Sequence, residues 1–379
     1  MSMGVPVDLG CILIQIQNVT KIFKTQAGDF TALKEINLCF GQGEYASIIG
    51  KSGSGKSTLI NMITGIDHPT SGEVRVADHD VHHMNESQLA DWRGRNLGIV
   101  FQFFQLLPML SILENTILPM DFCSQYPPGE RESRARELLD LVGLGAEADK
   151  LPAALSGGQQ QLAAIARALA NDPPLIVADE PTGNLDSRSA TRILDLFDAL
   201  VLQGKTVIIV THDSSLAKRT SRQILISDGM LIDENVAQAL PMLSHPQMLR
   251  LSHLAVARSF QPGATLARHE NGKVGLVVIA QGHVEAMRHY RSGESEMVER
   301  LGPGNYFSEL EMEQGERTPL TFCCAADEQV EALCVSHEAF HHFLGESPAA
   351  ESALRQVATE RFGHVHHPSR PRKTFWWRR

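Results

Sequence analysis

The stretch that decides the fold is GKSGSGKS, residues 50–57. It follows a strand-like apolar run, YASIIG, and it precedes a helix-like run, TLINMITG. Its pattern is G-x-x-x-x-G-K-[ST], in which Gly50, Gly53 and Gly55 let the backbone wind tightly enough for its N–H groups to point at an anion. The helix that follows adds the positive end of its dipole. The stretch therefore predicts a phosphate-binding loop between a β-strand and an α-helix.

The side chains of this loop suit a nucleoside triphosphate. Lys56 can reach the β- and γ-phosphates, and the hydroxyl of Ser57 can bind Mg²⁺. The residues that we assign to nucleotide contact here are Gly50, Ser52, Gly53, Ser54, Gly55, Lys56, Ser57 and Thr58.

A second stretch, LIVADE at 175–180, is an apolar run that ends in two carboxylates. A buried strand of this kind delivers charge to the carboxyl edge of a sheet. Asp179 is placed to hold the Mg²⁺ and Glu180 to polarise the attacking water. By itself this run is typical of an ordinary strand end, but together with the loop at 50–57 it favours catalysis.

The segments around these motifs alternate between two patterns. From about 11 to 234, β-type apolar runs such as TVIIVT alternate with helical patterns such as SRSATRILDLFDALVLQ, which predicts an α/β domain around a largely parallel sheet. Helical periodicity dominates 111–170 and predicts an inserted helical subdomain.

Between the two motifs lies LSGGQ, residues 155–159, and with it residues 11–234 resemble the nucleotide-binding subunit of an ABC transporter, a P-loop NTPase. The resemblance implies catalytic roles for Glu180, His212 and Gln102, with Gln102 also touching Mg²⁺ and facing the permease. It also implies that Phe23 stacks on adenine and that Asp186 lies at a dimer interface.

LSGGQ is suited to bind an anion, because a Ser and two glycines at the start of a helix form a second anion-binding N-terminus. In the family this motif closes over the γ-phosphate bound by the other subunit. The resemblance thus implies a head-to-tail homodimer with two ATP molecules between its halves. The residues assigned to this contact are Ser156, Gly157, Gly158 and Gln159.

The stretches VFQFFQLLPM and LSGGQQQLAAIARAL resemble the class that includes lipoprotein-release, cell-division and macrolide-export ATPases. The resemblance implies a permease with few membrane helices, and we expect a separately encoded permease for this chain. One departure is Leu162, where this class usually has Arg. A soluble ABC ATPase outside transport is the alternative, but such proteins normally carry two cassettes or a long coiled-coil insertion.

Composition sets limits on partners and location. The net charge of −10 argues against a nucleic-acid-binding protein, and no apolar run approaches the ~18 residues that cross a bilayer. The N-terminus lacks a signal-peptide pattern. We expect a cytoplasmic chain, peripheral on the inner face of the cell membrane through its permease.

The rest of the chain predicts a second domain. Residues 235–248, with two prolines and no motif, look like a linker, and 346–379 like a helical and basic tail. Between them, short apolar runs at 249–345 predict a small β-barrel or jelly roll that resembles the cyclic-nucleotide-binding fold. Its LGPGNYFSEL matches the approach to the phosphate-binding cassette of that family.

The cassette itself departs from the family pattern. By the resemblance, Glu309 would hold the ribose and Arg317 would neutralise the cyclic phosphate. However, Ser308 replaces a glycine, the spacing to Arg317 is one residue short, and 307–317 carry a formal charge of −3. A ligand-free docking or dimer-contact role is therefore favoured over cyclic-nucleotide binding. An ATPase gated by a cyclic nucleotide is the alternative.

Overall fold

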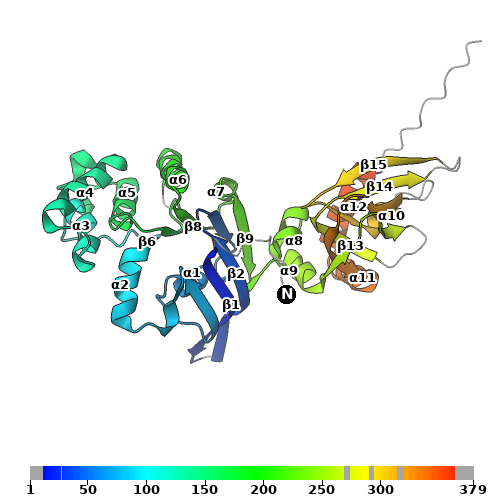
Figure 1. Cartoon of the computed structure of the whole chain (residues 1–379), viewed down its shortest axis with the longest axis horizontal. Helices are drawn as coiled ribbons and strands as arrows, with labels where there is room; N and C mark the ends of the chain where they lie inside the picture. The colour runs from blue at the N-terminus through cyan, green and yellow to red at the C-terminus, as the bar shows by residue number, and fades with distance from the viewer. Residues whose placement is uncertain are drawn as a thin grey trace, which may run out of the picture. The chain divides into compact units, whose positions relative to one another are not determined.

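The computed structural model of the chain describes residues 12–26, 28–183, 185–268, 274–289, 294–313 and 320–362. The chain forms two compact units, Met1–Glu234 and Asn235–Arg379 (Figure 1). Within the described ranges, no helix is both long and apolar enough to cross a bilayer.

The first unit contains two sheets. The larger has the order β10-β9-β3-β8-β7-β6 and is parallel except for β10, and the smaller, antiparallel sheet has the order β2-β1-β4-β5. The strands are β1 (Ile12–Thr25), β2 (Gly28–Gly41), β3 (Tyr45–Ile49), β4 (Ser71–Val76), β5 (His79–Asp80), β6 (Leu97–Val100), β7 (Leu175–Asp179), β8 (Thr206–Thr211), β9 (Arg222–Ser227) and β10 (Met230–Leu231).

Both faces of the parallel sheet are covered, as the strand β8 illustrates. Val207 and Ile209 belong to a core shared with the helices that follow β6 and β7, while Ile208 and Val210 belong to a core shared with the first helix and the antiparallel sheet. All four side chains are fully buried. This two-sided burial explains why the strands of the larger sheet are continuous apolar runs in the sequence.

The helices of the first unit include the predicted helical subdomain, in which α3, α4 and α5 pack on one another (Figure 1). Capping boxes at Ser111 and Ser156 start α3 and α5. The helices are α1 (Lys56–Ile63), α2 (Glu86–Asn96), α3 (Ile112–Phe122), α4 (Pro128–Leu141), α5 (Gly157–Ala168), α6 (Ser187–Leu202) and α7 (Ser214–Ala217).

The second unit is built on two four-stranded antiparallel sheets, β11-β18-β13-β16 and β12-β17-β14-β15, whose side chains share one core. Phe307 and Phe322, one from each sheet, stack with ring centroids 4.1 Å apart. The strands are β11 (Val256–Phe260), β12 (Thr265–Arg268), β13 (Val274–Gln281), β14 (Val284–His289), β15 (Ser295–Leu301), β16 (Tyr306–Ser308), β17 (Leu320–Cys324) and β18 (Val330–Ser336).

Five helices accompany these sheets in the part of the chain that the structure describes. The segment 235–248, predicted as a linker, is largely helical: it contains most of α8 and the start of α9. Pro246 lies in the first turn of α9, where a missing N–H costs nothing. The helices are α8 (Glu234–Ala239), α9 (His245–Leu254), α10 (Glu309–Glu313), α11 (His337–Glu346) and α12 (Pro348–Phe362). The predicted tail beyond 362 lies outside the described residues.

Candidate functional site

The predicted phosphate-binding loop joins β3 to α1. Gly53 and Gly55 have φ angles of +79° and +105°, in the region that favours glycine. A Cβ on Gly50 would lie 2.5 Å from the carbonyl oxygen of Ile226. The backbone path of the loop therefore depends on all three glycines that the motif supplies.

Lys56 lies at the centre of this loop. Its buried ammonium group donates to the carbonyl oxygens of Gly50 (2.8 Å) and Lys51 (3.0 Å). Because α1 begins at Lys56, the free N–H groups of its first turn meet the loop as well. Of the hydroxyl residues assigned here, Ser52 and Ser57 are exposed, Thr58 is half-buried and Ser54 is buried. The loop thus concentrates hydrogen-bond donors and the buried ammonium group of Lys56 in a small volume.

The proposed metal ligands meet at the carboxyl edge of the parallel sheet. The Ser57 hydroxyl donates to Oδ2 of Asp179 over 3.1 Å. Burial raises the pKa of Asp179, and the neighbouring Glu180 carboxylate raises it further, while the Ser57 hydrogen bond and Lys56 act in the opposite direction. Gln102 follows β6, which pairs in parallel with β7, so it leaves the sheet at the same edge as Asp179.

Glu180 and His212 form the second contact at this edge. His212 Nδ1 lies 2.8 Å from Glu180 Oε1, with the carboxylate largely buried and the imidazole 68% exposed. The Glu180 backbone N–H donates to the carbonyl of Val210, and its φ of +47° is unusual for a residue other than glycine. Such local strain is typical of functional sites.

The LSGGQ motif opens α5. Ser156 caps the helix, since its hydroxyl accepts from the Gln159 N–H while the Gln159 side chain accepts from the Ser156 N–H. A Cβ on Gly158 would meet the hydroxyl of Ser189 at 2.9 Å. A Cβ on Gly157 would meet nothing closer than 3.9 Å. Packing against the described residues therefore explains the glycine at 158 but not the one at 157.

The two remaining nucleotide residues lie on the surface of the first unit. Asp186 caps α6 by accepting from the backbone N–H groups of Arg188 and Ser189, and hydrogen bonds from Ser189 lower its pKa. Phe23 on β1 is 37% exposed, and the ammonium of Lys21 lies 4.9 Å from its ring centroid. No contact joins either residue to the loop in the ranges described.

In the second unit, Ser308, which stands where the cyclic-nucleotide-binding pattern has a glycine, is buried. The Ser308 N–H and hydroxyl both donate to Oε2 of Glu311, a fully buried carboxylate. Arg361 on α12 lies 3.7 Å from the other oxygen of Glu311 and donates to the Tyr306 carbonyl. These contacts tie the cassette to α12.

Of the two candidate ligand residues of this unit, the structure describes only Glu309. Glu309 is largely buried and both its carboxylate oxygens face histidines of α11. Arg317 lies outside the described residues. The pairing of Glu309 with Arg317 around a cyclic nucleotide, which the resemblance implies, is therefore not tested by the described residues.

Comparison with known proteins identifies the family. Residues 33–183 match the family described as ABC transporter. An uncharacterised ABC transporter ATP-binding protein of Bacillus subtilis, YknY, is 43% identical over 226 residues, which are 60% of this chain and 98% of that protein. This chain belongs to the ABC transporter ATP-binding proteins. The predicted ABC ATPase domain is confirmed, and the chain is an ATPase.

Other ABC proteins are similar to the same part of the chain. The macrolide export ATP-binding/permease protein MacB of Chlorobaculum tepidum is 40% identical over 67% of this chain and 39% of its own length. A dimeric structure of the bacterial ABC transporter cassette MJ0796 is 44% identical, with a TM-score of 0.55 over 57% of this chain and 96% of that one. The same cassette in a post-hydrolysis dimer bound to ADP and Pi is 43% identical, with a TM-score of 0.55 over the same shares.

The second unit matches a different family. Residues 257–347 fit the family described as cyclic nucleotide-binding domain. The predicted fold class, an ABC ATPase domain followed by a strand-rich domain of this type, is therefore confirmed.

One contact beside the ABC ATPase site was missed by sequence reasoning. Arg167, near the end of α5, donates to the carbonyl oxygens of Phe104 and Gln105, in the loop that follows Gln102. Both loop residues have positive φ. A lone Arg among the small apolar residues of LAAIARAL was the available signal. The departure at Leu162, by contrast, leaves a well-packed side chain, 5% exposed in the helical core.

Proposed function

We propose that this ABC ATPase binds ATP with Mg²⁺ at the edge of its parallel sheet, hydrolyses it as a head-to-tail homodimer and drives a separately encoded permease. The observation that carries the proposal is the pair of contacts at that edge, Ser57 with Asp179 and Glu180 with His212. Each pair joins a residue of one motif to a residue of another that is distant in sequence.

The residues at this edge of the sheet have different roles in binding and hydrolysing ATP. Lys56 and the loop N–H groups bind the phosphates, and Ser57, Asp179 and Gln102 would hold Mg²⁺, which neutralises phosphate charge when bound. Glu180 is close enough to His212 to be oriented by it, and its carboxylate accepts a proton from the attacking water. His212 is exposed on its other side, where it can reach the γ-phosphate.

The glycine at position 157 supports the proposed homodimer. Among the described residues, Gly157 has no neighbour that requires a missing Cβ, so the close approach it permits is available to a group from outside. The capped N-terminus of α5 suits an anion there. We infer that this group is the γ-phosphate bound by a second copy of the chain. The dimeric structure of the similar MJ0796 cassette supports an assembly of two copies.

Exposed apolar side chains support the proposed contact with a permease. Phe103, Leu107 and Met109 in the loop after β6, together with Phe122 at the end of α3, are 42–80% exposed. Large apolar residues exposed in this way favour a protein contact. The likeness to the MacB protein supports a permease of the lipoprotein-release and macrolide-export type, with the ATPase on the inner face of the membrane.

The catalytic assignment is tested with Glu180→Gln, which keeps shape but cannot accept a proton. We expect the rate of ATP hydrolysis to fall by at least about 100-fold, because a general base typically accelerates a reaction by that factor or more. The variant should still form a dimer with ATP and Mg²⁺, as measured by light scattering. Glu132→Gln, an exposed carboxylate on α4, is the matched control and should behave as wild type. Brisk turnover in Glu180→Gln would overturn the assignment.

The permease is tested by identifying which membrane protein co-purifies with the chain from its own cells. ATPase rates measured with and without that partner then show coupling. Association with ribosomes or DNA instead would favour an ABC ATPase outside transport.

For the second unit we infer a docking or dimer-contact role without a cyclic nucleotide. Ser308 is engaged by Glu311, and Glu309 by two histidines, so the groups that would meet the ligand already have partners. Calorimetry with cyclic AMP and cyclic GMP should give no heat with either. Heat that Arg317→Ala removes would instead support an ATPase gated by a cyclic nucleotide.

A further inference from the structure

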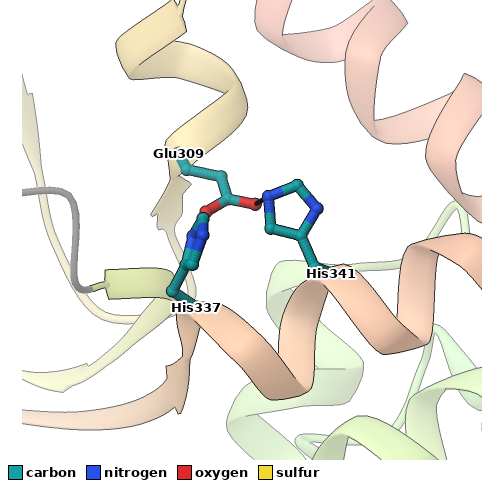
Figure 2. Close-up of side chains that lie close together, drawn as sticks. All are labelled: Glu309, His337 and His341. Atoms are coloured by element: carbon teal, nitrogen blue, oxygen red, sulfur yellow. Dashed lines mark hydrogen bonds and ion pairs between the residues drawn. The ribbon is translucent and has the colours of Figure 1, made fainter.

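Three side chains of the second unit converge on one point. Oε2 of Glu309 contacts Nδ1 of His337, and Oε1 lies 3.1 Å from Nε2 of His341. Figure 2 shows the carboxylate of α10 lying between two imidazoles of α11. Their donor atoms all lie within 4.8 Å of one another, and among the residues described this is the one such group of three.

The backbone holds the three residues firmly in place. The histidines are four residues apart, which puts both rings on one face of α11, and their centroids are 4.4 Å apart. Ser336 caps α11, and Phe340 packs so tightly on β13 that a Cβ on Gly275 would lie 2.4 Å from its Cβ. Glu309 directly follows β16. The cluster therefore rests on two sheet-anchored elements rather than on a loop.

The three side chains differ in burial, and this difference favours the binding of an ion from the solvent side. The Glu309 side chain is 10% exposed, whereas His337 and His341 are 45% and 52% exposed. A buried carboxylate is stable only with a charged or hydrogen-bonded partner. A cation that enters from the solvent side would meet the two ring nitrogens and the carboxylate together.

We propose that Glu309, His337 and His341 bind a divalent transition-metal ion, with zinc as the best match. Two imidazoles and one carboxylate with an open fourth position form a common Zn²⁺ ligand set, while Mg²⁺ and Ca²⁺ prefer oxygen donors alone. Tetrahedral ligands at zinc distances lie roughly 3.3 Å apart. The three donor atoms already lie within 4.8 Å of one another, so small rotations of the half-exposed rings are enough to reach that spacing.

A bound ion would have two effects on this unit. It would bridge α10 to α11 and so fix the cassette to β18, the strand that leads into α11. It would also occupy the carboxylate that a ribose would need. Metal and cyclic nucleotide are therefore mutually exclusive at Glu309.

The test is a Co²⁺ titration of the full chain without ATP and with excess Mg²⁺, followed by visible absorption and by competition with Zn²⁺. Wild type should show the absorption bands of nitrogen-ligated, four-coordinate Co²⁺, and Zn²⁺ should remove them. His341→Ala and Glu309→Gln should each weaken binding more than about 100-fold, since loss of even an outer partner of a ligand costs about 10–100-fold.

The matched control is His342→Ala. His342 is the next residue on α11, is 67% exposed and contacts Arg250 and Glu346 instead of Glu309. It should titrate as wild type. Metal binding that is equal in wild type, His341→Ala and Glu309→Gln, or its absence in all three, would overturn the proposal. Neither result depends on ATP hydrolysis, so the ATPase assignment is tested separately.

Discussion

The contact between Arg167 and the loop after β6 gives the most specific prediction. Arg167 donates two hydrogen bonds, to the carbonyls of Phe104 and Gln105, and these residues hold left-handed conformations that are costly without support. Hydrogen bonds from a charged donor contribute about 1.5–3 kcal/mol each. Because the loop is partly exposed, the lower value applies, and Arg167→Met should destabilise the ordered loop by about 3 kcal/mol.

This loss corresponds to about 100-fold in the equilibrium for loop opening. Amide hydrogen exchange over 103–107 should accelerate by up to that factor. Because Gln102 precedes this loop and is proposed to touch Mg²⁺, kcat for ATP should fall about 10- to 100-fold. Arg167→Lys, which keeps the charge, should recover part of the rate.

The matched control is Arg134→Met. Arg134 on α4 also donates to a backbone carbonyl, that of Ala170 just beyond α5, but it does not touch the loop. It should lower stability with little change in kcat. If Arg167→Met left loop exchange and kcat unchanged, or if both variants lost the same activity, Arg167 would have no positioning role.

Two further predictions concern stability. Burial raises the pKa of Asp179, so the folded chain binds its proton more tightly than the unfolded chain, and stability without ligand should fall as pH rises above the ordinary carboxyl range. Asp179→Asn should flatten this dependence in thermal melts from pH 4.5 to 8, and equal slopes in both proteins would contradict the reasoning. Phe307 is fully buried and stacks on Phe322, so Phe307→Ala should lower the free energy of unfolding of the second unit by about 3–5 kcal/mol. Hydrogen exchange of β13 and β17 measures this, and unchanged protection there would refute it.

The sequence predicts the first unit well because its chemistry is carried by short contiguous motifs. The loop at 50–57 and the carboxylates after β7 lie where strand and helix periodicity puts them. Arg167 could not be predicted, because its partners are backbone carbonyls, which no side-chain pattern records.

In the second unit, the surroundings of prolines and charges add what the sequence alone does not give. The prolines of 235–248 suggested a linker, and the structure shows that Pro246 lies in the first turn of α9, which accepts it. Counting Glu309 and Glu311 as charges that repel phosphate treated them as exposed, whereas the structure buries both and pairs them. The convergence of His337 and His341 on Glu309 depends on the packing of α11, which sequence spacing alone does not give.

The double-sided burial of β8 also bears on how this sequence can change over evolutionary time. Val207 and Ile208 are neighbours in the chain, yet one packs with the helical subdomain and the other with the antiparallel sheet. A substitution at either position is compensated only by residues on its own side. The helical subdomain and the antiparallel sheet can therefore diverge at separate rates while the strand between them still leads into His212.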